Sequence, residues 1–183
     1  MPSTRILQII ATLDRAGAEK QLTLLSTHLP RDEFDVHVCA LTRGGPYAAD
    51  LKSHEIPLTV IGKRWKADPR AYLRLKRLIA RLRPDIVQTW LFTANAYGRR
   101  AALACGVPVV IGSEQCADPW KRWHQLAIDR HLARRTARIV VNGRGVREFY
   151  VAQGIQPELF VLIENGIERH QPGTLSRMRC SRL

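Results

Sequence analysis

The chain has 183 residues, of which 45% are hydrophobic and 25% charged, as is typical of one soluble globular domain. No apolar run approaches the roughly 20 residues of a membrane-spanning helix, and the four cysteines form no Cys-x-x-Cys pair or zinc-finger pattern, so we expect no metal site. The N-terminus leads straight into a predicted strand without room for a signal peptide, and we therefore expect a cytoplasmic protein.

The net charge of +13 is the one unusual bulk property, and it is unevenly distributed. Residues 63–83 contain nine Lys and Arg against one Asp, and residues 169–183 contain four Arg and no acid. Such charge favours anionic partners, namely phosphates, acidic lipid surfaces or nucleic acid. The charge alone does not select among these three, but no nucleic-acid reader module is recognisable, so nucleic acid is the least favoured partner.

Short apolar runs alternate with helical patterns along the chain. The apolar runs predict strands at residues 5–10, 35–41, 58–61, 86–89, 109–113 and 139–141 and a short buried strand at 161–163. Helical spacing predicts helices at residues 17–29, 46–54, 69–82, 93–105, 120–136 and 145–153, the third of them capped by Asp68 and Pro69.

This alternation of strands and helices defines the expected fold class. It is α/β, a doubly wound, mostly parallel Rossmann-like sheet of about seven strands with helices on both faces. We expect this domain to occupy residues 1–168, and residues 169–183 to form a basic, disordered tail because they show no apolar periodicity.

Ligands of such sheets bind beyond the carboxyl ends of the strands, so the loops there hold the candidate site residues. In the loop after the first strand, Ala16 and Gly17 are small enough for a ligand to approach the backbone, and the following helix N-terminus favours an anion. A tight turn without a ligand fits this loop equally well. Its single glycine matches neither a dinucleotide fingerprint nor a Walker loop.

Further candidates follow the fourth and fifth strands. Trp90, Thr93 and Asn95 combine an aromatic face with polar groups, which suits a sugar or a lipid head group. In the alternative reading, Trp90 and Phe92 belong to the core. Glu114 follows the fifth strand and is placed to bond a hydroxyl or balance a cation, although an exposed cap is an equally good interpretation. The histidines are scattered and form no triad pattern.

A basic stripe is predicted on the helix at residues 69–82. Arg70, Arg74, Arg77 and Arg81 follow 4-3-4 spacing, so they share one face opposite the apolar residues. A solvated face is one interpretation. The other is docking on an anionic membrane surface, worth roughly 1 kcal/mol per basic residue near that surface, which would make the protein peripheral on the inner face of the membrane.

Several segments, taken in order, resemble family-four glycosyltransferases of the GT-B type. They are residues 6–10 (ILQII), 16–22 (AGAEKQL), 83–90 (RPDIVQTW), 106–110 (GVPVV), 146–150 (VREFY) and 165–168 (NGIE). Each segment is weakly specific alone, but the collinear set spans residues 5–168 and is more specific.

The resemblance implies an enzyme with two Rossmann-like domains, in which the N-terminal domain mostly holds the acceptor and the C-terminal domain holds most of the nucleotide-sugar donor. It implies transfer with retention of configuration at the anomeric carbon. The segment at 165–168 lies where such enzymes enter the donor domain. We therefore expect the acceptor-binding half, lacking the donor domain and inactive alone, with an acceptor glycan or a lipid-linked sugar as its ligand.

The nucleotide-sugar is then expected only together with the missing domain, and the open side of the domain favours self-association or a separate donor-domain partner. The alternative is a stand-alone binding module that docks on an anionic membrane or on a donor-domain partner. A nucleotide-binding oxidoreductase is disfavoured because the glycine fingerprint is missing.

Two departures from the family pattern affect the site. Ala16 replaces the first glycine of a Gly-Gly-Ala-Glu loop, and alanine fits there if its φ angle is negative. Related sequences often carry a histidine after the fourth strand, where this chain has Trp90 and Thr93. No catalytic residue is therefore assigned.

Overall fold

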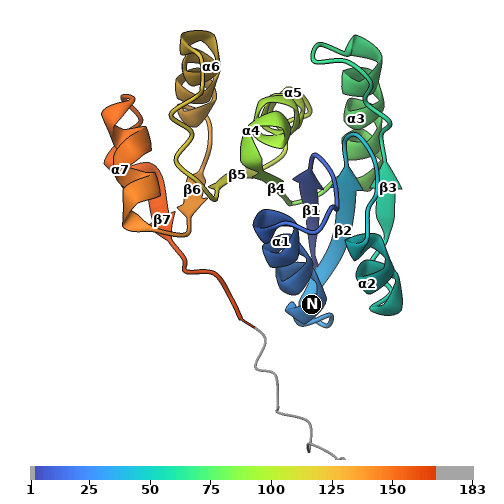
Figure 1. The fold of residues 1–183 in the computed structure, drawn as a ribbon. Helices are drawn as coiled ribbons and strands as arrows, with labels where there is room; N and C mark the ends of the chain where they lie inside the picture. Colours follow the sequence, from blue (N-terminus) through green and yellow to red (C-terminus); the bar gives the residue numbers. More distant parts are fainter. Residues whose placement is uncertain (1–2, 168–183) are drawn as a thin grey trace, which may run out of the picture.

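The computed structural model describes residues 3–167, which contain one seven-stranded sheet in the order β3-β2-β1-β4-β5-β6-β7 (Figure 1). All six strand pairings are parallel. The strands are β1 (Thr4–Ile10), β2 (Phe34–Ala40), β3 (Leu58–Val60), β4 (Ile86–Trp90), β5 (Val109–Glu114), β6 (Arg138–Val141) and β7 (Phe160–Leu162). The predicted fold class and its seven strands are confirmed.

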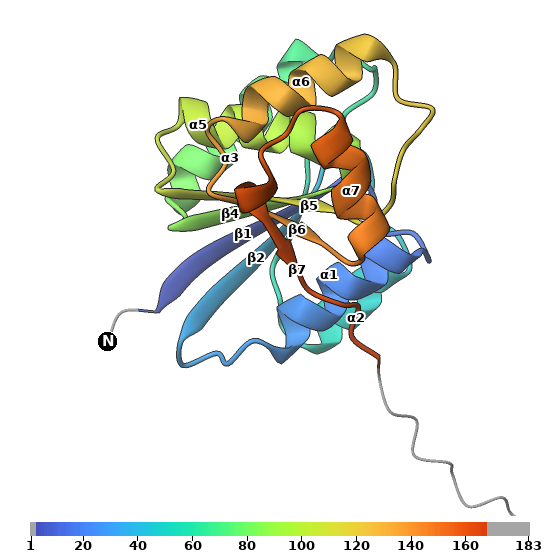
Figure 2. The ribbon, with the colours of Figure 1, turned by 90° about the vertical axis from the view of Figure 1, so that its left-hand side faces the viewer.

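Helices connect successive strands and cover both faces of the sheet. They are α1 (Gly17–His28), α2 (Tyr47–Ser53), α3 (Pro69–Leu82), α4 (Leu91–Ala94), the π-helical η1 (Asn95–Arg99), α5 (Arg100–Ala104), α6 (Trp123–Ala133), α7 (Arg144–Ala152) and the 3-10 helix η2 (Pro157–Leu159). Figure 2 shows α3, α5 and α6 on one side of the sheet and α1 and α2 on the other. The sheet is therefore doubly wound, as predicted.

The core follows from the alternation of side chains along the strands. Leu7 and Ile9 of β1 pack with Leu75 of α3 on one face of the sheet. Ile10 packs with Leu22 of α1 on the opposite face. The start of α3 is fixed as expected, since the Asp68 carboxylate accepts a hydrogen bond from the backbone N–H of Ala71 at 2.9 Å and Pro69 occupies the first turn.

The helix expected at residues 93–105 is built differently. It begins at Leu91, whose φ is +64°, and it contains the π-helical segment η1. This wider turn directs both Asn95 and Arg99 inward, and both side chains are fully buried. Gly98 permits the close approach, because a β-carbon there would lie 2.5 Å from Thr89 Cγ2. The spacing of apolar residues in the sequence gives no indication of such buried polar contacts.

Three further expectations need correction. The helix expected from residue 120 starts only at Trp123, because Lys121 is held in a buried ion-pair cluster before it. Glu114 is the last residue of β5 rather than the residue after it. The short strand at the end of the sheet is not buried: β7 is an edge strand, and Leu162 is 43% exposed. The tail predicted at 169–183 lies outside the described residues.

Candidate functional site

A buried ionic cluster lies at the carboxyl edge of β5, beneath the loop that leads to α6. Its centre is Lys121, whose Nζ lies 2.9 Å from Asp129 Oδ2, 3.3 Å from Asp118 Oδ2 and 3.7 Å from Glu114 Oε1. The same ammonium donates a hydrogen bond of 2.6 Å to the hydroxyl of Tyr150. We call these residues, together with Arg99, the ionic cluster.

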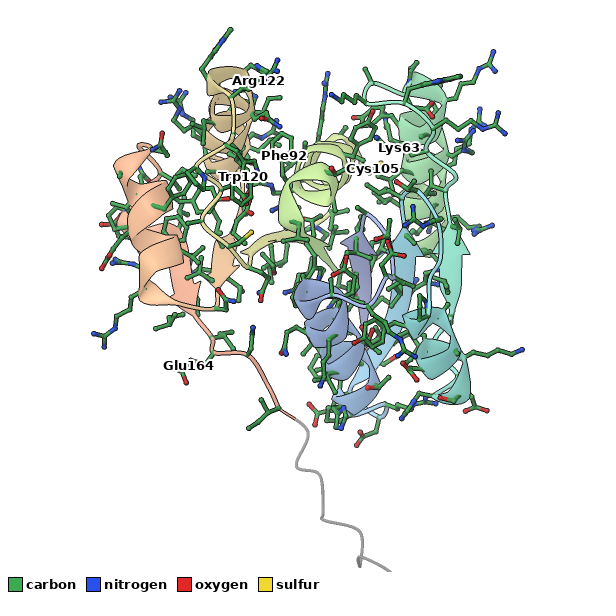
Figure 3. All side chains as sticks on the ribbon, in the orientation of Figure 1. Lys63, Phe92, Cys105, Trp120, Arg122 and Glu164 are labelled. Carbon is green, nitrogen blue, oxygen red and sulfur yellow. The ribbon has the colours of Figure 1, made fainter. Side chains whose placement is uncertain are left out.

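Aromatic rings enclose the ammonium group as well. Lys121 Nζ lies 5.0 Å from the centroid of the Phe92 ring and 4.7 Å from that of Tyr150, so cation–π attraction adds to the ion pairs. In the view of Figure 3, the labelled Phe92 and Trp120 both lie in the region between α4 and α6. The loop of residues 115–122 is thereby tied to the sheet through one buried lysine.

The charges of the ionic cluster are close to balanced. Arg99 donates to the second oxygen of Asp129 at 2.9 Å, so two cations face three carboxylates. Burial is the largest cause of the raised pKa of Glu114, and the nearby Asp129 also raises it; Lys121 and Arg99 lower it, and the resulting pKa is about 7. Burial opposes the charge of Lys121, but Glu114, Asp129 and Asp118 outweigh it and raise the pKa of this lysine. A proton on Glu114 makes the cluster neutral.

The structure brings two of the predicted site residues together. Asn95 Nδ2 donates to Glu114 Oε1 at 2.8 Å and to the backbone carbonyl of Ser113 at 3.2 Å. Its own side-chain oxygen accepts a hydrogen bond from Thr89. Asn95 and Glu114 are both buried, so in this chain they hold the edge of the sheet together and do not face solvent.

Trp90 lies apart from that pair, on the α1 side of the sheet. It is 4% exposed, packs in the core with Leu22, and donates its indole N–H to Gln8 Oε1 at 2.7 Å. Gln8 in turn donates to Gln88 at 3.1 Å, so a chain of buried amides crosses the central strands. Thr93 is half-buried in α4, the short helix that directly follows Trp90.

The first loop, between β1 and α1, is exposed to solvent, as ligand binding at this loop requires. Ala16 has φ of −138°, so alanine is accommodated there without strain. Gly17 begins α1, and a β-carbon added there would meet nothing within 4 Å. Burial raises the pKa of Glu19 in the first turn of α1, and one of its carboxylate oxygens has no partner within residues 3–167. Ligand contact by Ala16 or Gly17 stays a prediction.

The basic stripe on α3 is exposed at all four arginines, as predicted from their spacing. Arg74 is engaged locally, because its guanidinium donates to the carbonyls of Ile61 at 2.9 Å and Gly62 at 3.2 Å. Arg70, Arg77 and Arg81 are the three remaining cations of the stripe. Within the described part of the chain, no group of His, Cys, Asp and Glu side chains could hold a metal ion. No helix of residues 3–167 is long and apolar enough to cross a membrane.

Sequence reasoning missed most of the ionic cluster. Arg99, Asp118, Lys121, Asp129 and Tyr150 come from four different segments of the chain. No spacing rule joins residues so far apart. The one available signal lies in residues 120–136, the segment predicted as a helix. In its apolar pattern, Lys121 and Asp129 do not occupy the positions expected of surface residues.

Comparison with known proteins assigns the chain to a family. The Glycosyltransferase Family 4 model matches residues 15–171, which include the first loop, the ionic cluster and the segment after β7. The chain belongs to Glycosyltransferase Family 4. A comparison with curated protein sequences gives no match.

Solved structures share the fold of this Glycosyltransferase Family 4 chain. HepE (Alr3699) of Anabaena in complex with UDP superposes with a TM-score of 0.76 at 18% identity, over 90% of this chain and 45% of HepE. The lipopolysaccharide outer core galactosyltransferase WaaB gives 0.67 at 15% identity, over 90% of this chain and 46% of its own length. The UDP-GlcNAc 2-epimerase of Methanocaldococcus jannaschii gives 0.63 at 13% identity, over 88% and 46%. The chain therefore spans about half the length of these structures.

Proposed function

We propose that this chain is the acceptor-binding part of a glycosyltransferase, and that the acceptor binds at the carboxyl edge of the sheet, over the loop after β1, helix α4 and the loop after β5. The observation that carries the proposal is the ionic cluster beneath this edge. Asn95 of η1 bonds to Glu114 at the end of β5, and Lys121 connects the loop after β5 to α6 and α7. A buried, fully packed base of this kind holds the loops above it in a fixed geometry, as a binding site requires.

Family membership supports sugar transfer as the reaction, and the resemblance of residues 5–168 to the N-terminal domain supports the acceptor role. HepE has been solved with UDP and with UDP-glucose, which supports a nucleotide-sugar as donor. The chain matches less than half of HepE, so we propose that most donor contacts come from a separate domain. The isolated chain is then expected to bind an acceptor, either a glycan or a lipid-linked sugar, but to transfer nothing.

Two measurements test this proposal. The purified chain is incubated with UDP-glucose and a panel of acceptor glycans, and release of UDP is followed; turnover by the chain alone would contradict its role as one half of an enzyme. Amide NMR spectra are then recorded during titration with the same acceptors. We expect shifts at Gly17 and Thr93, and a response confined to residues far from the carboxyl edge would contradict the proposed site.

A matched pair of variants sharpens the second measurement. Gly17→Val fills the open space above the first loop, where a β-carbon meets nothing within 4 Å, and it should weaken acceptor binding without unfolding the chain. Ala80→Val, at an exposed position of α3, should leave binding unchanged.

The basic stripe favours a second candidate function, docking on an anionic membrane surface. Arg70, Arg77 and Arg81 project from one exposed face of α3, and Trp65, just before this helix, is 62% exposed. Cations beside an exposed tryptophan suit the head-group region of a bilayer. We expect the chain to float with phosphatidylglycerol vesicles, to be released by salt, and not to float with phosphatidylcholine vesicles.

Replacement of Arg70, Arg77 and Arg81 by Gln should weaken this docking by about a hundredfold. The control replaces the exposed Arg134, Arg144 and Arg147 by Gln, which changes the net charge equally. Equal loss of flotation in both triple variants would show that only overall charge matters, and would remove the docking role of α3.

A further inference from the structure

A large groove runs along the helical layer between α3, α5 and α6, which Figure 2 shows next to one another on one side of the sheet. Its volume is about 1120 Å³, at the upper end of ligand pockets, which span roughly 300–1,000 Å³. Most of its lining is apolar or aromatic, and is provided by Tyr72, Ala96, Tyr97, Leu103, Ile128 and Leu132.

The groove is long rather than round. It follows α6 from Ala127 past the end of this helix to Arg135, and it follows η1 and α5 from Ala96 to Ala104. The nine helical residues from Ala96 to Ala104 correspond to a length of about 12 Å. Small side chains at Ala96, Ala104 and Ala127 keep the space between the helices open. This shape suits an extended hydrocarbon chain.

Cations surround one end of the groove, where α3 begins. The Arg100 guanidinium lies 5.7 Å from the centroid of the Tyr72 ring, and Lys63 Nζ lies 5.1 Å from that of Tyr97. Tyr97 fixes the adjoining loop, because its hydroxyl accepts a hydrogen bond from Asp68 N at 2.7 Å and donates one to the carbonyl of Lys66 at 2.8 Å. Lys63 and Arg100 thus lie against two tyrosines in edge-to-face contact, and Lys66 lines the same end of the groove.

One acidic group, Asp68, attracts one of these cations, Lys63. None of the three forms an ion pair within residues 3–167. The one carboxylate that lines the groove, Asp68, is occupied by the backbone N–H groups of Ala71 and Arg64. With three cations and one carboxylate, this end of the groove carries a net positive charge next to an apolar channel.

We propose that the groove binds an amphiphile made of one hydrocarbon chain and an anionic phosphate head group, with the chain along α5 and α6 and the phosphate at Lys66 and Arg100. The site lies on the helical layer, apart from the open first loop, and its occupation requires neither a nucleotide-sugar nor sugar transfer. The inference therefore goes beyond the proposed function. Charge complementarity favours this ligand over a second copy of the chain, because the net charge of +13 opposes self-association.

Calorimetric titration of the purified chain with decyl phosphate and dodecyl phosphate, each below its micellar concentration, tests the chain-length requirement. Two additional methylenes in an apolar groove should tighten binding about fifteenfold. Inorganic phosphate alone should not bind measurably. Equal affinity for both alkyl phosphates would overturn the proposal, as would binding of inorganic phosphate with the affinity of dodecyl phosphate.

Three variants then locate the ligand. Ala104→Trp, at an exposed residue that lines the groove, should abolish binding of dodecyl phosphate and of the neutral dodecyl maltoside. Arg100→Gln should weaken dodecyl phosphate about tenfold and leave dodecyl maltoside unchanged. Arg134→Gln removes the same charge at an exposed position that does not line the groove and serves as the matched control, with little effect expected.

Sedimentation tests the remaining alternative, in which a second copy of the chain occupies the groove. If the groove instead joins two copies of the chain, the wild type sediments as a dimer, Ala104→Trp restores a monomer, and dodecyl phosphate has no effect, which would overturn the proposal. These titrations contain no nucleotide-sugar and no acceptor glycan. Absence of alkyl phosphate binding would therefore not contradict the proposed glycosyltransferase role, and failure of the acceptor-binding tests would not contradict the groove proposal.

Discussion

Gln21 of α1 and Gly166, which are 145 residues apart, exchange two hydrogen bonds. The Gln21 side-chain amide donates to the Gly166 carbonyl at 2.9 Å, and Gly166 N–H donates to Gln21 Oε1 at 2.8 Å. Both partners belong to segments that carry the family resemblance, residues 16–22 and 165–168. Helix α1 and the segment that leaves β7 are thus joined to each other by this pair of hydrogen bonds.

The variant Gln21→Ala should release the segment that follows β7. Because the contact is exposed, each of its hydrogen bonds contributes only about 1 kcal/mol, and the free energy of global unfolding should fall by about that amount or less. Amide hydrogen exchange at Gly166 should accelerate clearly. The exposed Gln156→Ala is the control, and unchanged protection of Gly166 in Gln21→Ala would contradict a fastening role.

Lys121 is expected to be the most sensitive charged residue of the chain. Lys121→Met leaves three carboxylates around a site that no longer holds a cation, and removal of one partner from a buried ion pair typically costs about 3–5 kcal/mol. Urea unfolding followed by circular dichroism measures the loss. Lys52→Met, at an exposed position of α2, should change stability by less than about 0.5 kcal/mol, and similar losses in the two variants would show that the cluster contributes little.

The fold could be predicted from the sequence because its signals are local. Apolar runs such as residues 86–89 identify strands, and Asp68 with Pro69 marks the start of α3, where the structure places both. The contacts of the candidate site are not local. Lys121 meets Tyr150 only after β5, α6 and α7 have packed, and Asn95 meets Glu114 only through a π-helical turn that no propensity rule indicates.

The sequence therefore indicates where the candidate residues lie along the sheet but not how their side chains are surrounded. Trp90 and Glu114 are expected just after strands at the carboxyl edge, and they are the last residues of β4 and β5 at that edge. Their burial depends on neighbours from distant segments, Gln8 for Trp90 and Lys121 for Glu114. Position at an edge follows from strand order, whereas exposure depends on the packing of the whole domain.

Two glycines near the first loop should differ sharply in their tolerance of alanine. A β-carbon at Gly45 would overlap the carbonyl oxygen of Leu13, a backbone atom that cannot move away without disturbing the end of β1. Gly45→Ala should therefore destabilise the chain by about 1–3 kcal/mol. Gly17→Ala has open space around it and should be neutral or slightly stabilising. Thermal unfolding compares the two, and a reversed order would show that the loop has a different backbone path.

Glu114 should make the stability of the domain depend on pH near neutrality. Its pKa is about 7 in the folded chain against 4.5 as the ordinary value, so between these values the folded state holds a proton that the unfolded state has released. The resulting stabilisation is complete below about pH 4.5 and is lost as the pH rises through 7. Glu114→Gln keeps the shape of the protonated carboxyl but cannot ionise. Urea unfolding at pH values from 5 to 8 should therefore show wild type losing about 1–3 kcal/mol relative to this variant as the pH rises. Other titrating groups, Glu19 among them, are common to both proteins and cancel in the difference. Parallel stability curves would mean that Glu114 stays ionised throughout, held by Lys121 against the effect of burial.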